Sequence, residues 1–279
     1  MIDARRTAWI FVLPAMAAIA MVAIVPMAWT AWESLHLHDL RMPWLGRPFV
    51  GLDNYREAFT DPRFLSACVR TAAFAAVSVA FELALGLLAA LAMSRATRGR
   101  AAIRLLVLAS WAVPTVVAAL VWRFMFEGGA NSWFADPVAA WVPIVLADAW
   151  KMTPFVALLL LAGLESIDPA LYDAARIDGA SDWRQFREIT LPLLRPALLV
   201  AVLFRALDAF RVFDVIYVMT GGGPGTSTEP ISLYTFSVLL QHLRFGYGSA
   251  LSIVVFLTTF VLALVYIRLA SRQLLETQR

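Results

Sequence analysis

Six long runs of apolar residues alternate with polar segments along this chain of 279 residues. Each run has at least the roughly 20 residues that an α-helix needs to cross the hydrocarbon core of a bilayer. The pattern therefore predicts an all-α integral membrane protein, with six transmembrane helices in a single domain that covers residues 1–279. The predicted spans are approximately residues 8–32, 69–94, 103–126, 142–165, 193–219 and 248–268.

The first run follows Arg5 and Arg6, an arrangement that also occurs in signal peptides. Its length of about 24 residues, however, exceeds the 7–15 residues of a signal-peptide core. Trp9, Trp29 and Trp32 lie near its two ends, where aromatic residues gather at membrane interfaces. We therefore expect an uncleaved span.

The composition supports a membrane protein and excludes several other classes. The chain is 61% hydrophobic and 15% charged, whereas soluble domains have about 45–50% apolar and 25% charged residues. Its only lysine is Lys151, which excludes a Walker-type phosphate-binding loop and hence an ATPase of that kind. One cysteine, Cys68, and three histidines make no credible zinc site. No nucleophile motif is present, so we expect a non-catalytic chain. We also expect no cofactor of its own, no metal site and no nucleic-acid partner.

One polar segment, residues 166–192, interrupts the apolar runs between the fourth and fifth spans. We call it the polar hairpin, because its local pattern predicts two short helices. Asp168 can cap the first helix, and Gly179 can end it in a left-handed conformation. Ser181 can cap the second, which we expect to run until Pro192 breaks its hydrogen-bond ladder.

The polar hairpin carries a spaced motif. Asp173-Ala174-Ala175, three residues, Gly179, nine residues and Ile189-Thr190-Leu191-Pro192 resemble the EAA loop of ABC-importer permeases, in which glutamate stands in place of Asp173. In that family the loop is a coupling helix seated in a groove of the cytoplasmic ATPase subunit. The resemblance gives an ATPase-coupling role to Tyr172, Asp173, Ala174, Ala175, Asp178, Gly179, Ile189, Leu191 and Pro192.

Other segments are similar to the carbohydrate branch of these permeases. They are Gly51–Tyr55, Trp150–Phe155, Leu158–Gly163, Phe204–Asp214 and Thr220–Pro224. The chain thus resembles a permease subunit of a binding-protein-dependent ABC sugar importer of the maltose/trehalose type, with the type I importer fold. The resemblance implies a di- or oligosaccharide cargo such as trehalose or maltose. It also implies a second permease in a heterodimer, two ATPase subunits that bind ATP and Mg, and an extracytoplasmic sugar-binding protein.

The basic residues predict the orientation independently of the motif. The N-terminus, the 95–104 loop, the polar hairpin through Arg195 and the tail from Arg268 contain 2, 4, 4 and 3 arginines. In a six-span topology all four segments lie on one face, and the positive-inside rule assigns that face to the cytoplasm. We expect both termini and the polar hairpin to be cytoplasmic, in the inner membrane of a bacterium or archaeon.

Charged residues also occur within the spans, where each costs about 2.5–3.5 kcal/mol on insertion scales. Two interpretations stay open for them: they line the sugar path, or they form a self-neutralised network that holds the partner permease. Glu82, alone in the second span, is expected to be a satisfied structural carboxylate. The residues of the tentative substrate pathway are Asp148, Trp150, Lys151, Arg205, Asp208, Arg211 and Asp214.

Three alternative functions remain at the level of the sequence. Arg205 and Arg211 would suit an importer of the same class that carries glycerol phosphate or another polar solute. The intramembrane carboxylates would suit an ion-coupled secondary carrier, although no inverted repeat typical of such carriers is found. An integral membrane enzyme is the third alternative, and it lacks any catalytic constellation.

Overall fold

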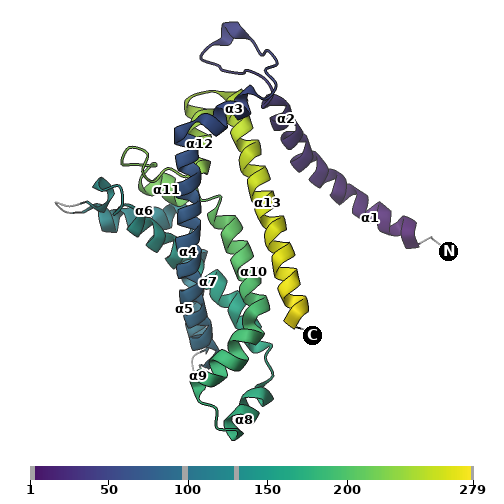
Figure 1. Ribbon diagram of the computed structural model, residues 1–279, viewed down its shortest axis with the longest axis vertical. Helices are drawn as coiled ribbons and strands as arrows, with labels where there is room; N and C mark the ends of the chain where they lie inside the picture. The colour runs from purple at the N-terminus through teal and green to yellow at the C-terminus, as the bar shows by residue number, and fades with distance from the viewer. Residues whose placement is uncertain (1–3, 96–99, 129–131, 278–279) are drawn as a thin grey trace. The chain divides into compact units, whose positions relative to one another are not determined.

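The computed structural model describes residues 4–95, 100–128 and 132–277, and most of these residues are helical (Figure 1). Within these residues the only extended pairings are two isolated bridges, His36 with Phe49 and Asp39 with Arg244. The chain forms two compact units. The first comprises the residues up to Ser66 together with Tyr234–Thr258, and the second comprises Ala67–Leu233 together with the residues from Thr259. The all-α prediction is confirmed for the described residues.

Five helices in the described part of the chain are long and apolar enough to cross a membrane. They are Phe11–Glu33, Pro62–Arg95, Trp141–Glu165, Asp182–Ala209 and Phe245–Ala270. The second, fourth and sixth predicted spans each lie within one of these helices. The first, residues 8–32, begins three residues before Phe11 but lies within the continuous helical run of residues 4–33. The third and fifth predicted spans differ from the expectation and are taken up below.

The main feature of the first unit is the loop between its helices α2 and α3. Its elements are α1 (Ala4–Ile19), a π turn (Ala20–Ile24), α2 (Val25–Glu33), a 3-10 turn (Pro43–Leu45), α3 (Asp53–Thr60), the start of α4 (Pro62–Arg95), the end of α12 (Ile231–Phe236), a π turn (Ser237–Gln241) and the first part of α13 (Phe245–Thr277). The loop between α2 and α3 extends beyond the ends of α2, α3 and α13 (Figure 1). The Asn54 amide group donates to the carbonyl oxygens of Ser34 and His36, which ties this loop to α3.

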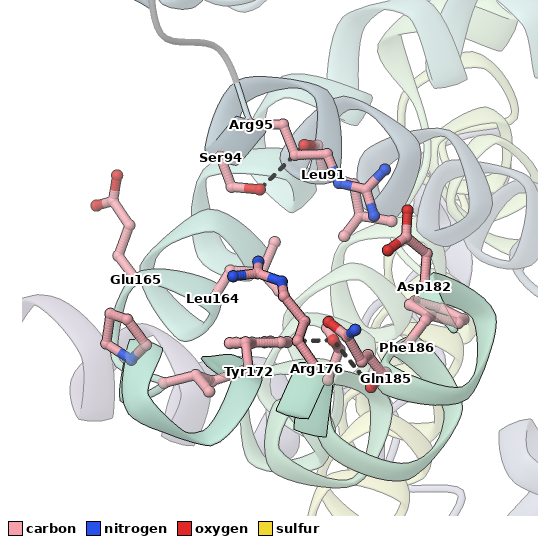
Figure 2. A pocket seen from close by; sticks show the side chains of 13 residues that line it. Leu91, Ser94, Arg95, Leu164, Glu165, Tyr172, Arg176, Asp182, Gln185 and Phe186 are labelled. Carbon is pink, nitrogen blue, oxygen red and sulfur yellow. Dashed lines mark hydrogen bonds between the residues drawn. The ribbon is translucent and has the colours of Figure 1, made fainter. Parts of the chain in front are cut away.

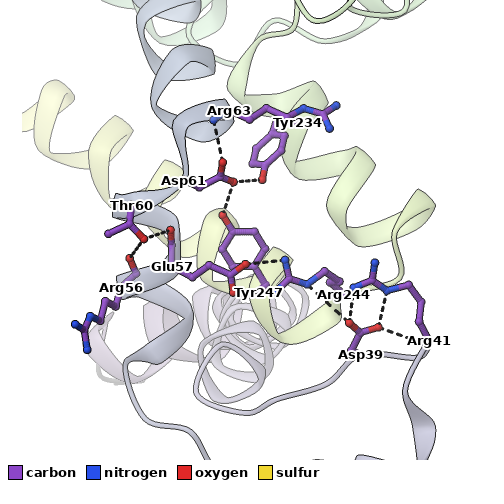
Figure 3. A network of polar contacts seen from close by, with 10 residues as sticks. All are labelled: Asp39, Arg41, Arg56, Glu57, Thr60, Asp61, Arg63, Tyr234, Arg244 and Tyr247. Carbon is purple, nitrogen blue, oxygen red and sulfur yellow. Dashed lines mark hydrogen bonds and ion pairs between the residues drawn. The ribbon is translucent and has the colours of Figure 1, made fainter.

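A polar network fixes the base of the same loop (Figure 3). The Asp39 carboxylate accepts from Arg41 Nη2 at 2.6 Å and lies 3.8 Å from Arg244 Nε. Arg244 in turn makes a two-pronged pair with Glu57, with N–O distances of 2.7 and 2.8 Å. The hydrogen bond from Arg41 lowers the pKa of Asp39 below its usual value of 3.8. The charged form of Asp39 is therefore part of what stabilises the loop.

We expect this loop to loosen in acid. A carboxyl group with a lowered pKa in the folded state stabilises the fold above its unfolded pKa, near 3.8, and this contribution is lost as the pH falls through the lower folded value. The N–H of Leu40, which donates to Leu243 O at 3.0 Å, is the reporter. Its protection from hydrogen exchange, corrected for intrinsic rates, should hold at pH 5 and fall below pH 3.8.

Asp39→Asn should remove most of that acid dependence. It should also lower the protection of Leu40 at pH 6 by about 10- to 100-fold, because a hydrogen bond to a charged group contributes roughly 1.5–3 kcal/mol. Asp53→Asn, at an exposed carboxyl group in the same unit, is the matched control and should change the protection little. Equal protection in the Asp39→Asn variant and the unmodified protein would contradict the prediction.

The second unit contains the remaining elements. They are the rest of α4, α5 (Arg100–Ala112), α6 (Thr115–Glu127), a 3-10 turn (Trp133–Ala135), α7 (Trp141–Glu165), α8 (Pro169–Ile177), α9 (Asp182–Gln185), a π turn (Phe186–Thr190), α10 (Leu191–Ala209), α11 (Asp214–Met219) and the remainder of α12 and α13. Helix α7 packs against α5, α6, α10 and α11. Buried Ala157, Leu160 and Leu194 form part of a core in which α4, α7 and α10 meet. Gly86 permits the close approach of α4 to α7, since a Cβ there would lie 2.5 Å from a methyl group of Val156.

The third predicted span, residues 103–126, is not one continuous helix. It divides into α5 and α6 at Val113 and Pro114, and Pro114 has an extended conformation with φ −55° and ψ 137°. Proline has no N–H for the helical ladder, and its ring clashes with the preceding turn. Each half-helix has 13 residues, so neither reaches the length of a span alone.

The fifth predicted span, residues 193–219, is also interrupted, and its start was predicted wrongly. Helix α10 ends at Ala209, and α11 begins only at Asp214. At its other end α10 continues without a break from α9 through the π turn, so Pro192 does not end the second hairpin helix. In this turn the N–H of Leu191 donates to Phe186 O, five residues earlier. The widened turn accommodates the proline that an α-helical ladder would reject.

Candidate functional site: the polar hairpin and a charged pocket

Both helices of the polar hairpin begin at the predicted caps, and the first also ends where predicted, before Gly179. The Asp168 carboxylate caps α8 by accepting from the N–H of Ala170 at 2.9 Å. Gly179 follows α8 with φ +75°, a conformation that glycine adopts without strain. The Ser181 hydroxyl caps α9 by accepting from the N–H of Arg184 at 3.4 Å. Local sequence signals therefore define this hairpin.

The residues given a coupling role fall into two groups. Asp173, Ala174, Asp178 and Gly179 are exposed on α8 and the turn that follows it, and Asp173 pairs with Arg176 at 2.7 Å. The second group is half-buried and lies between the two arms or at the root of the hairpin. It consists of Tyr172, Ala175, Ile189, Leu191 and Pro192. The exposed group alone is available to a large docking partner.

Two apolar residues join the exposed surface, although the motif does not include them. The side chain of Ile177 at the end of α8 is 87% exposed, and Trp183 on α9 is 69% exposed. If their side chains form one patch with the exposed part of α8, they would add apolar area to a surface that another protein could cover. The signal in the sequence was their position in a short polar segment between two predicted spans.

A cavity of about 600 Å³ lies between the hairpin and the ends of α4 and α7 (Figure 2). Its lining includes Ser94 and Arg95 from α4, and Arg176 extends toward them from α8. The Tyr172 hydroxyl and Thr190 Oγ1, 3.0 Å apart, share a hydrogen bond that holds the two arms together beside this space. The hairpin is thus a braced unit with open volume between α8 and the neighbouring helix ends.

A second cluster surrounds Arg205, whose side chain is 1% exposed. Its guanidinium group bonds to Glu82 on α4, with Nη2–Oε1 at 2.7 Å, to Asp148 on α7 at 3.1 Å, and to Asp208 on α10. Ser78 Oγ lies 2.8 Å from Asp148 Oδ2 and 3.0 Å from Glu82 Oε1. The expectation that Glu82 is a satisfied carboxylate agrees with this geometry.

The two interrupted spans meet beside this cluster. A cavity of about 150 Å³, which we call the break pocket, lies between the break at Pro114, the break after Ala209 and helix α7. Its lining residues are Thr115, Asp148, Lys151, Met152, Asp208, Ala209, Arg211, Val212, Phe213, Asp214 and Val215. Five of the seven residues of the tentative substrate pathway therefore share one cavity.

The other two pathway residues lie elsewhere. Arg205 is buried behind the break pocket and reaches it only through Asp148 and Asp208. Trp150 does not line the pocket, and its ring lies 6.4 Å from that of Trp122 on α6. Ligand pockets usually enclose about 300–1,000 Å³, so the break pocket in this conformation is too small for a disaccharide.

The comparisons with known proteins identify the class of the chain. A family model described as "Binding-protein-dependent transport system inner membrane component" matches residues 82–275. The chain belongs to this family. The permease is 41% identical over 277 residues to the trehalose/maltose transport system permease protein MalF of Thermococcus litoralis, covering 94% of this chain and 93% of that protein. It is 38% identical over 275 residues to the trehalose transport system permease protein SugA of Mycobacterium tuberculosis, covering 95% and 89%.

The fold agrees with that of a solved transporter. A bacterial ABC transporter for import of the acidic polysaccharide alginate contains a chain that aligns with a TM-score of 0.83 at 22% identity, over 95% of both chains. The type I importer fold expected from the resemblance is confirmed. The permease is an ABC transporter subunit of the inner membrane without catalytic residues of its own, which removes the enzyme and secondary-carrier alternatives.

Sequence reasoning missed some members of the charged site. It did not connect Glu82 with Arg205, which are 123 residues apart, or place Ser78 between Glu82 and Asp148. The one available signal was a carboxylate within an apolar span, because such a group needs a buried partner. That this partner is Arg205 follows only from the packing of α4 against α10.

Proposed function

We propose that the permease imports a neutral di- or oligosaccharide, such as trehalose or maltose, into the cytoplasm. The observation that carries this proposal is its 41% identity, across nearly the whole chain, to a permease named for trehalose and maltose transport. The charge of the break pocket favours a neutral cargo over glycerol phosphate. Its lining has three acidic side chains, of Asp148, Asp208 and Asp214, against two basic ones. Carboxylates suit sugar hydroxyl groups, whereas an excess of acid repels phosphate.

The same proposal includes the partners and the orientation. A second permease would complete the translocation path as a heterodimer in the lipid bilayer, and an extracytoplasmic protein would deliver the sugar. Two ATPase subunits would bind ATP and Mg, so that this chain needs neither. The polar hairpin and both termini would face the cytoplasm of a bacterium or archaeon, with all spans acting as one permease domain. The exposed surface with Asp173, Ile177 and Asp178 supports an ATPase contact there.

The mechanism follows from the continuity of the helices. ATP would close the ATPase pair, and the polar hairpin would move with the subunit that holds it. Because α9, the π turn and α10 form one helix from Asp182 to Ala209, the motion would pass directly to Arg205 and Asp208. The break pocket would then widen toward the delivered sugar, which the carboxylates would hold by hydrogen bonds before release inward.

Affinity purification of the permease in mild detergent from its native host tests this proposal first. We expect mass spectrometry to find a Walker-motif ATPase and a second multi-span permease. Proteoliposomes containing that assembly, with the binding protein outside, should then take up radiolabelled trehalose or maltose only when ATP is enclosed in the lumen, where the inward-facing ATPase subunits can use it. Sulfoquinovosyl glycerol, the solute named for a 36% identical permease of Agrobacterium fabrum, is the informative competitor. Uptake of that anion but of neither disaccharide would contradict the neutral-sugar proposal.

A further inference from the structure

The break in the third span leaves backbone carbonyl groups without helical donors. In a continuous helix the carbonyl oxygens of Trp111 and Val113 would accept from the N–H groups of residues 115 and 117. The extended conformation of Pro114 ends that ladder. Unsatisfied carbonyl groups are costly within a bilayer, where no water replaces the missing donors.

Lys151 supplies the missing donors. Its Nζ atom on α7 lies 3.3 Å from Trp111 O and also donates to Val113 O. The lysine side chain suits this role, because it combines a flexible stem with three rotatable donors on a compact cation. It is the only lysine among 23 basic residues, although arginine is used everywhere else. The contact is therefore specific in chemistry as well as in position.

We propose that Lys151 is a positioning residue of the transport cycle, a tie between α7 and the end of α5 that sets the angle between α5 and α6 at the break pocket. Helix α6 packs against α11, and Arg123 Nη1 on α6 donates to Val218 O at 3.1 Å. The half-helices α6 and α11 are thereby joined to each other on one side of the two breaks. On the other side of the breaks, the hydrogen bonds from Lys151 hold the end of α5 against α7. This tie therefore controls how the break pocket opens between α5 and the joined pair of α6 and α11.

This role goes beyond the proposed function, since it does not depend on the cargo. It distinguishes Lys151 from Arg211, the other cation that lines the break pocket. Arg211 Nε donates to Leu207 O within its own helix end, so it joins no two spans through that bond. Removing either cation changes the charge of the pocket equally, but only the loss of Lys151 removes hydrogen bonds to the end of α5.

Pulsed electron paramagnetic resonance on the assembled importer in nanodiscs tests the tie directly. Spin labels replace Leu105 on α5 and Phe124 on α6, whose side chains are 70% and 84% exposed, in a Cys68→Ser background. We expect Lys151→Met to broaden and shift the distance distribution between the labels. Lys151→Arg, which keeps a cation with several donors, should restore a narrow distribution, and Arg211→Met should leave it unchanged.

A transport readout completes the experiment. In the same importer, Lys151→Met should lower the sugar imported per ATP hydrolysed by about tenfold among the molecules that assemble, in addition to any loss of stability from the unpaired carbonyl groups. A purely stabilising role would instead lower only the thermal unfolding midpoint of the assembly and leave that ratio unchanged in the molecules that assemble. If Lys151→Met does not assemble, Lys151→Gln, whose amide group has a shorter reach, replaces it with the same expectation. A label distance unchanged in the Met or Gln variant, or changed equally by Arg211→Met, would overturn the proposal.

Discussion

Replacing Gly179 by aspartate is expected to abolish ATP-driven uptake while the permease still inserts and assembles. Gly179 has φ +75°, and a Cβ added there would meet no atom within 4 Å. Aspartate tolerates this left-handed conformation at a cost of about 1–2 kcal/mol, so the exposed turn should still form. The new carboxylate would join Asp173 and Asp178 on the surface proposed to contact the ATPase. A misplaced charge at an interface costs several kcal/mol, so uptake should fall at least about tenfold.

Gly179→Asn is the matched control for this variant. Asparagine has the same shape as aspartate and also tolerates a positive φ, but it adds no charge. It should therefore retain more uptake than Gly179→Asp at equal amounts of protein in the membrane. The measurement is ATP-dependent sugar uptake in proteoliposomes, normalised to inserted permease. Normal uptake by a well-inserted Gly179→Asp variant would show that the polar hairpin does not couple to the ATPase through this surface.

Arg205→Met should have the largest effect on stability. The substitution leaves Glu82 and Asp148 without their common cation. The carboxyl group of Glu82 is fully buried. Breaking a buried ion pair by removing one partner typically costs about 3–5 kcal/mol, because the remaining charge is uncompensated. We expect a strongly reduced yield of assembled importer and a clearly lower thermal unfolding midpoint in detergent.

The loss should be partly reversible by a second substitution. Glu82→Gln removes the most deeply buried of the uncompensated charges, so the Arg205→Met and Glu82→Gln double variant should be more stable than Arg205→Met alone. Arg211→Met, on the same segment but with an exposed side chain, should cost little stability. Additive effects of the two buried substitutions would mean that the pair is not coupled.

Much of the architecture was predictable because it rests on local rules. Apolar runs of sufficient length place the spans, and the caps at Asp168 and Ser181 and the left-handed Gly179 define the hairpin from its sequence alone. The charges at Asp148, Arg205 and Asp208 were expected to avoid lipid, since insertion is costly, and they do lie together. These features depend on residues that are close in sequence or on the bilayer itself.

The remaining features depend on contacts between distant segments. The gap between α10 and α11 contains neither proline nor glycine, and the Ser232 hydroxyl donates to Val212 O there. No local pattern announces that partner, 20 residues further along the chain. At Pro192 a local rule was overridden by the π turn before it. Lys151 was assigned to the sugar path by its charge, whereas its hydrogen bonds go to the end of another span.

The π turn at Phe186–Thr190 also has a rotational consequence. Along an α-helix each residue turns the chain by about 100°, so one additional residue within a turn changes the azimuth of everything beyond it. Because the helix runs unbroken from Asp182 to Ala209, this single turn sets the direction in which α8 faces around the axis of α10. The direction of the hairpin around the helix axis and that of the Arg205 cluster are therefore fixed relative to each other. Rotating one of them about this axis would rotate the other as well.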